Sequence, residues 1–145
     1  MELNIYGWSI LEKYFPKVSF SKTFLKKSLK KEISDLEIDS LNVIFVPEDE
    51  IKRLNSEYRG KDTSTDVLSF RIEENPLKGE IYLSPEYISK ENDEKEILRV
   101  IVHGILHLVG FEHEGYFDEE SFKEEEMFVK QEEILENVYT KFNKN

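Results

Sequence analysis

The chain has 145 residues, of which 39% are hydrophobic and 12% aromatic, and this predicts a folded globular protein with a real core. Cysteine is absent, which excludes disulfide scaffolds, thiolate zinc sites and cysteine nucleophiles. The net charge of −11 is uneven: residues 1–71 contain 12 basic and 12 acidic side chains, whereas residues 72–145 contain 8 and 19. The neutral N-terminal half is therefore free to carry a basic face, so RNA binding is permitted but not indicated.

The sequence gives no sign of a membrane segment. Its first ten residues lack the basic and apolar regions of a signal peptide. The longest apolar run, Ile97 to Leu108, is interrupted by polar residues and is too short to span a bilayer. We therefore expect a cytoplasmic protein without membrane contact. No repeat or linker divides the chain, so residues 1–145 are predicted to form a single domain.

The first half of the chain predicts two strands and two helices. Alternation of Leu3, Ile5 and Trp8 indicates a short strand. A helix capped by Ser19 or Ser21 is expected to end near residue 33, followed by a buried strand over 41–46 and a helix over 48–57.

One face of the helix predicted before residue 33 is strongly basic. Two interpretations are open, a solvated amphipathic face or a surface that contacts RNA. The side chains concerned are Lys22, Lys26, Lys27, Lys30 and Lys31.

The second half predicts strands over 66–70 and 80–84 and helices over 93–109 and 118–139. Four short strands with helices before, between and after them predict an α+β domain. We expect a small four-stranded mixed sheet with four to five helices.

All three histidines of the chain lie within eleven residues, at His103, His107 and His113. Two residues four apart on a helix project from the same face, so the first two rings should lie together. Gly110 is suited to end the helix in the left-handed conformation, which would let the chain fold back and present the third ring. We predict a metal site on this helix and the turn that follows it.

Three neutral imidazoles form a suitable site for one Zn²⁺ ion, and Ni²⁺ or another late divalent ion would also suit. A fourth, open coordination position is typical of a catalytic site, where the metal activates water and polarises a substrate oxygen. The alternative is that the histidines serve only in packing.

The histidine spacing matches the extended zincin protease pattern His-Glu-x-x-His-x-x-Gly-x-x-His, with one difference. Gly104 stands where a protease has its general-base glutamate. Carboxylates at Glu112, Glu114 or Asp118 could replace it only with a different geometry. A peptidase is therefore the second enzyme hypothesis.

Two sequence blocks resemble the YbeY-type endoribonucleases. The first is His103-Gly104-x-Leu106-His107-Leu108-x-Gly110-Phe111-Glu112-His113, in which Glu112 replaces the family's usual aspartate. The second is Asn55-x-x-Tyr58-Arg59-Gly60-Lys61-Asp62-x-x-Thr65-Asp66-Val67-Leu68-Ser69-Phe70. The length, the order of elements and the strand start at Gly79-Glu80-Ile81 also match, so the resemblance covers nearly the whole chain.

This resemblance implies a metal-dependent endonuclease specific for single-stranded RNA. It implies a role in 16S rRNA 3′-end maturation and ribosome quality control, with the small ribosomal subunit as partner. By motif position, His103, His107 and His113 would bind zinc, and Arg59 would be the functional arginine.

Arg59 also suits this chemistry on its own account, because a guanidinium is a fixed, always charged partner for a phosphodiester. The alternative is a surface arginine in a polar turn whose other side chains bind the anion, namely Lys61, Thr63, Ser64 and Thr65. No residue identifies a general base, and attack by water or by the RNA 2′-hydroxyl fits these side chains equally. A non-enzymatic assembly factor with a structural metal is the third hypothesis.

Overall fold

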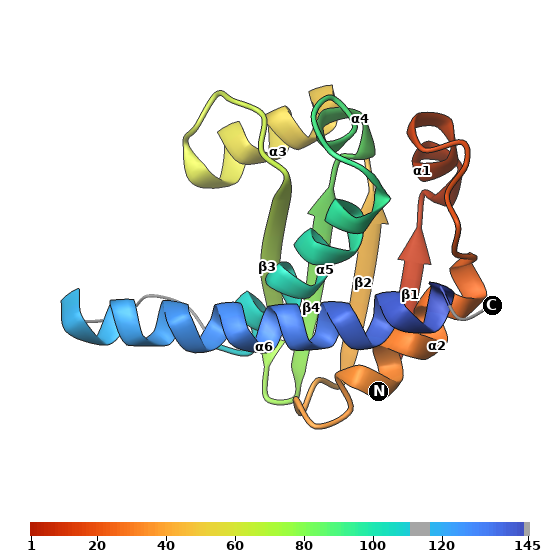
Figure 1. Ribbon diagram of the computed structural model, residues 1–145. Helices are drawn as coiled ribbons and strands as arrows, with labels where there is room; N and C mark the ends of the chain where they lie inside the picture. Colours follow the sequence, from red (N-terminus) through yellow and green to blue (C-terminus); the bar gives the residue numbers. More distant parts are fainter. Residues whose placement is uncertain (111–116, 144–145) are drawn as a thin grey trace.

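A computed structural model of the chain describes residues 1–110 and 117–143, with side chains for 1–110 and 126–140. Four strands form one sheet: β1 (Glu2–Tyr6), β2 (Ser40–Phe45), β3 (Val67–Glu74) and β4 (Leu77–Leu83). Their order is β1-β2-β4-β3 (Figure 1), with β1, β2 and β4 parallel and β3 antiparallel to β4. The predicted α+β fold with a four-stranded mixed sheet is confirmed, and β3 lies at its edge.

Six helices accompany the sheet in the described part of the chain: α1 (Trp8–Tyr14), α2 (Lys22–Glu32), α3 (Glu48–Arg59), α4 (Pro85–Ile88), α5 (Glu94–Leu108) and α6 (Phe117–Asn143). Helix α5 lies on one face of the sheet, and the long helix α6 runs across α5 and α2 (Figure 1). None of the helical segments described is both long and apolar enough to cross a membrane.

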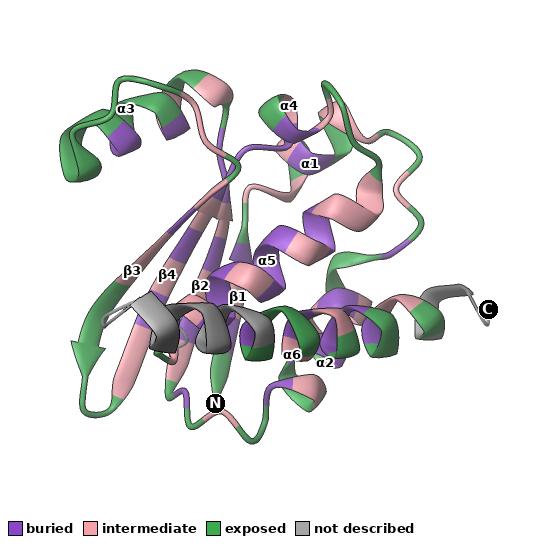
Figure 2. Ribbon diagram, turned by 60° about the vertical axis from the view of Figure 1, so that its left-hand side comes forward, coloured by how far each residue is buried: buried purple, intermediate pink, exposed green. Residues whose placement is uncertain are grey.

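The two faces of the sheet differ because side chains alternate along each strand. On one face, Val43, Phe45 and Ile81 are fully buried in the main core, which includes the apolar residues of α5 (Figure 2). On the other face, α3 covers one end through Ile51 and Leu54. Helices on opposite faces of the sheet therefore meet at the edge strand β3.

The rest of the second face is polar. Asn4 Nδ2 donates to Asn42 Oδ1 at 3.2 Å, Asn42 Nδ2 donates to Glu80 Oε2 at 3.3 Å, and the Tyr82 hydroxyl donates to Glu80 Oε1 at 3.1 Å. This row crosses the three parallel strands and satisfies polar groups that the apolar core could not accept.

The predicted elements differ from the structure in three places. The strand interpretation was wrong at Trp8, which begins α1, because Gly7 turns the chain with φ of 80°. Helices α1 and α4 were not predicted. Helix α4 has only four residues and α1 fully buries only Leu11, so neither helix gives a clear hydrophobic periodicity in the sequence. Strand β3 continues beyond Phe70 to Glu74, and β4 begins at Leu77 rather than residue 80, because the pairing of the two strands continues past a register shift.

Helix α2 begins after Ser21, whose hydroxyl accepts a hydrogen bond from the Phe24 amide, so the predicted cap is confirmed. Its basic side chains are solvent-exposed apart from the half-buried Lys26. The exposure agrees with either interpretation of this face, a solvated surface or one that contacts RNA.

Two glycines with positive φ allow a matched test of the turn before α1. A Cβ at Gly7 would lie 2.3 Å from the Phe45 carbonyl oxygen, whereas a Cβ at Gly60 would meet nothing within 4 Å. Both alanine variants suffer left-handed strain of about 1–2 kcal/mol. We expect Gly7→Ala to lower the free energy of unfolding, measured in urea, by about 2 kcal/mol more than Gly60→Ala does, because a backbone clash must also be relieved. Equal losses would contradict this account.

Candidate active site

Helix α5 is a buried helix with one open stripe. The Asp93 carboxylate caps it by accepting from the Lys95 amide, and Glu94 and Glu96 favour its N-terminus. From Ile97 to Leu108 it is buried almost all round, but His103 and His107 are half-exposed. The predicted helix and the shared face of these two rings are confirmed.

The two imidazoles approach each other through their Nε2 atoms. His103 Nε2 lies 2.8 Å from His107 Nε2, and the ring centroids are 4.4 Å apart. Two histidine nitrogens on one tetrahedral zinc ion lie about 3.3 Å apart, given Zn–N bonds of about 2.0–2.1 Å. The pair therefore fits a metal after a shift of about 0.5 Å.

His113, the third predicted ligand, lies outside the described residues, so its convergence with the other two rings stays a prediction. Among the residues that are described, no group of three or more potential ligands is assembled. Gly110 does end the helix with φ of 98°, as predicted. Arg71 Nε stabilises the same helix end by donating to the Leu108 carbonyl oxygen at 2.9 Å.

Gly104 faces the sheet rather than the histidines. A Cβ at this position would lie 2.9 Å from Ser69 Oγ and 3.2 Å from Ile81 Cγ2. The Ser69 hydroxyl also donates to the Gly104 carbonyl oxygen at 3.1 Å. A glutamate here would be buried against β3 and β4, so the helix cannot supply the zincin general base from this position.

Arg59 is the last residue of α3 and is exposed. Gly60 follows it in the left-handed conformation, with φ of 68°, and its amide donates to the Ser56 carbonyl oxygen. This cap ends the helix and releases the chain toward β3.

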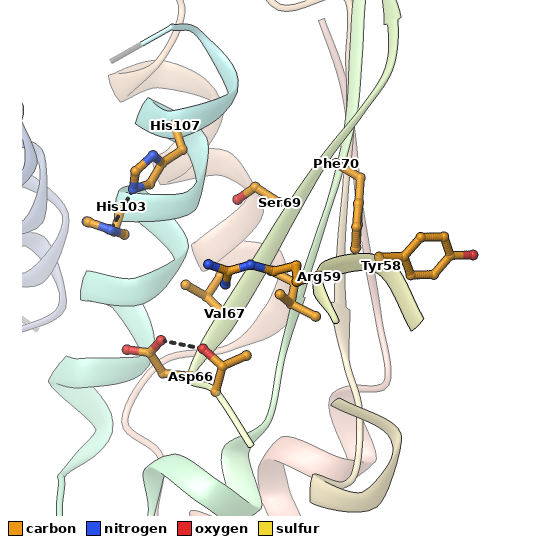
Figure 3. Close-up of a pocket in the computed structure, with 10 residues that line it drawn as sticks. Tyr58, Arg59, Asp66, Val67, Ser69, Phe70, His103 and His107 are labelled. Carbon is orange, nitrogen blue, oxygen red and sulfur yellow. Dashed lines mark hydrogen bonds between the residues drawn. The ribbon is translucent and has the colours of Figure 1, made fainter. Parts of the chain in front are cut away.

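A cleft brings Arg59 together with His103 and His107. It has a volume of about 530 Å³ and lies between α5, the end of α3 and the edge strand β3. Figure 3 shows the Arg59 guanidinium directed toward the side of the cleft that carries the two histidines. The other lining residues are Tyr58, Thr65, Asp66, Val67, Leu68, Ser69 and Phe70.

The loop after Arg59 is held by its own polar groups. The buried Asn55 donates from Nδ2 to the Thr63 carbonyl oxygen at 2.9 Å, and the Ser64 hydroxyl donates to Glu48 Oε2 at 2.8 Å. Hydrogen bonds from Lys90 and Ser64 keep the pKa of Glu48 below its ordinary value. Of the four alternative anion donors, Thr65 alone lines the cleft, which favours Arg59 as the phosphate partner.

Three residues of the site escape prediction from sequence. Asp66 and Ser69 line the cleft, and their presence in the second motif block was a signal that was not given a role. Gln131 is the third, and its Oε1 atom lies 2.7 Å from His103 Nδ1, within hydrogen-bond distance. It is a polar residue within an apolar stripe of α6, which is a signal in the sequence.

The chain is similar to proteins of one family. Residues 13–139 match the family described as Endoribonuclease YbeY. A protein of that name from Thermotoga maritima is 49% identical over 100 residues, covering 64% of the chain and 64% of that relative. Another from Persephonella marina is 37% identical over 140 residues, covering 87% and 89%. The matched part is thus less than two thirds of the Thermotoga protein's length.

A solution structure of a Thermotoga maritima protein has the same fold. It aligns with a TM-score of 0.63 at 38% sequence identity, covering 99% of the chain and 93% of that protein. The agreement therefore extends over nearly the whole chain.

The loop anchor at Asn55 can be tested by an isosteric change. Asn55→Asp removes the donor to Thr63 and places a carboxylate oxygen against a carbonyl oxygen in a buried position. We expect the free energy of unfolding, measured in urea, to fall by about 2–3 kcal/mol. Amide hydrogen exchange at residues 61–66 should become faster. Asn92→Asp is the control, since Asn92 Nδ2 makes the same kind of bond to the Ile88 carbonyl oxygen away from the cleft. Similar losses in both variants would show that Asn55 is not a special anchor.

Proposed function

The chain belongs to the YbeY endoribonuclease family, and we propose that it is a zinc-dependent endonuclease for single-stranded RNA that acts in the cleft beneath Arg59. One observation carries this proposal, namely that an arginine and two converging imidazoles line the same cleft. We propose His113 as the third ligand, as the spacing predicts. Imidazole nitrogens are ordinary ligands of zinc, and an arginine fits a phosphodiester.

In this proposal each residue has a separate task. His103 and His107 fix the metal position from one helix face. When bound, zinc supplies a Lewis acid for a phosphate oxygen or a water molecule. Arg59 binds the phosphodiester and compensates the negative charge that develops on it. Asp66, which lines the same cleft, is a carboxylate that could orient the nucleophile or accept its proton. Water and the RNA 2′-hydroxyl both remain suitable nucleophiles.

We further propose that the natural substrate is ribosomal RNA, at the 16S 3′ end and in ribosome quality control, with the small ribosomal subunit as partner in the cytoplasm. Family membership supports this assignment. The peptidase hypothesis is weaker because Gly104 packs against the sheet. An assembly factor with a purely structural metal would not need an arginine in the cleft.

One experiment separates these functions. Purified, nuclease-free protein is incubated with single-stranded RNA, duplex RNA or casein, each with zinc and after chelation. We expect cleavage of single-stranded RNA that is lost on chelation and restored by zinc. Casein cleavage would favour the peptidase. No cleavage of any substrate, together with loss of thermal stability on chelation, would favour the assembly factor.

The ligand assignment predicts that His107→Ala no longer retains one equivalent of zinc. Two remaining histidines and water form a much weaker site than three histidines. The measurement is metal content after dialysis of the zinc-loaded protein, with circular dichroism to verify folding. Retention of one zinc per chain by a folded His107→Ala variant would refute the assignment.

The role of Arg59 predicts that Arg59→Glu keeps its fold and zinc but loses at least about 100-fold in RNA cleavage, the scale of one lost transition-state contact. Arg59→Lys should recover part of the rate, because charge survives without the bidentate geometry. Arg53→Glu is the matched control: Arg53 lies on the same helix, is exposed and pairs with Glu50 and Glu57. If both glutamate variants lose activity equally, net charge rather than cleft position explains the loss.

A further inference from the structure

We propose that Gln131 is a positioning residue that fixes the proton of His103 on Nδ1 and thereby presents Nε2 to the metal. This inference rests on the proposed function for the identity of the ion. The residue lies on α6, which runs across α5 (Figure 1), and is separated from His103 by 28 positions in the sequence.

The burial of Gln131 is unusual for its type. It is only 6% exposed and belongs to a stripe of α6 that is otherwise apolar, made up of Met127, Ile134, Leu135 and Val138. A buried amide costs stability unless its hydrogen bonds are made. Its place in the core is therefore explained by its partners rather than by packing.

The orientation of the Gln131 amide follows from its second partner. Its Nε2 atom lies 3.2 Å from Glu132 Oε2, and a carboxylate can only accept. Burial raises the pKa of Glu132, but the hydrogen bond from Arg99 helps to hold that pKa below its ordinary value. Because the Glu132 carboxylate is paired with Arg99, it is an acceptor whichever way the Gln131 amide faces. Reversing the amide would place two oxygens against each other, so Oε1 must face His103.

The imidazole proton follows from the amide. Because Oε1 is an acceptor and lies 2.7 Å from His103 Nδ1, that ring nitrogen must carry a hydrogen. In the neutral ring the Nε2 lone pair is then free of a proton, which is the form that binds a metal. The direction of Nε2 toward His107 is consistent with this state.

The chain of contacts is anchored at its outer end. Arg99 Nε donates to Glu132 Oε2 at 3.3 Å, and Arg99 also pairs with Glu96 on its own helix. Glu132 accepts from both Arg99 and Gln131, and Gln131 in turn accepts from His103, so the ring tautomer is set from α5 through α6 and back.

The test compares three variants in zinc affinity, measured by competition with a chelator. We expect Gln131→Leu to bind zinc about 10–100-fold more weakly, as is typical when a partner of a metal-bound histidine is lost. The double variant Gln131→Glu with Glu132→Gln exchanges the two side chains and keeps both net charge and an acceptor at His103. Its zinc affinity should lie within about threefold of that of the parent protein, since the acceptor that orients the ring is retained.

Glu136→Gln is the control for helix packing, because Glu136 joins α6 to α5 through Lys95 at 2.8 Å without reaching the histidines. It should change thermal stability but not zinc affinity. In the metal-free proteins, long-range ¹H–¹⁵N NMR of the histidine rings reports the tautomer directly. We expect the Nδ1–H form of His103 in the parent protein and in Glu136→Gln, and a mixture in Gln131→Leu.

Zinc affinity and ring tautomer unchanged in Gln131→Leu would overturn the inference while leaving the proposed function intact. A parent protein without stoichiometric zinc binding would overturn both. If the parent protein does not cleave RNA, but Gln131→Leu still changes zinc affinity and the His103 tautomer, the nuclease proposal alone would be refuted.

Discussion

Helix α5 and strand β4 approach closely where glycine removes the side chain between them. A Cβ at Gly79 would lie 2.7 Å from a methyl carbon of Leu108, and one at Gly104 would press on Ser69 and Ile81. This contact fixes both the height and the rotation of α5 above the sheet. The rotation in turn leaves His103 and His107 as the half-exposed stripe of an otherwise buried helix. A larger residue at Gly104 would press on Ser69 and Ile81, and relieving that contact by lifting α5 would move the two rings relative to Arg59.

The cleft combines parts with different demands on the fold. The two histidines need only one regular helix, because their separation of four residues already places them together. Arg59 needs a helix end, a left-handed glycine and an anchored loop, all on the opposite face of the sheet. The edge strand allows these two elements to share one cleft, since a central strand would separate them. The same geometry assigns Gly104 to packing, which distinguishes this site from that of a zincin despite the shared histidine spacing.

The sequence was most informative where chemistry and periodicity coincide. The helix around His103, its end at Gly110 and the strand over 41–46 follow from spacing alone, and the motif containing Arg59 directed attention to the correct loop. The position of that loop across from the histidines required the pairing of β3 with β4, which no local pattern encodes. Gln131 was missed because its partner is 28 residues away and the register of α6 on α5 decides their contact. Helix α4 was missed because four residues form too short a pattern.

Strand β3 has a further consequence for self-association. An edge strand exposes backbone groups that can pair with another chain. Beyond the cleft, the exposed residues of β3 include the charged Arg71, Glu73 and Glu74, and the pairing with β4 is irregular between Arg71 and Glu73. Charge and an irregular register both disfavour the addition of a further strand. Within the cleft, α5 stands over Val67 and Ser69 on one side. The edge can thus remain accessible to a ligand while it resists intermolecular sheet growth.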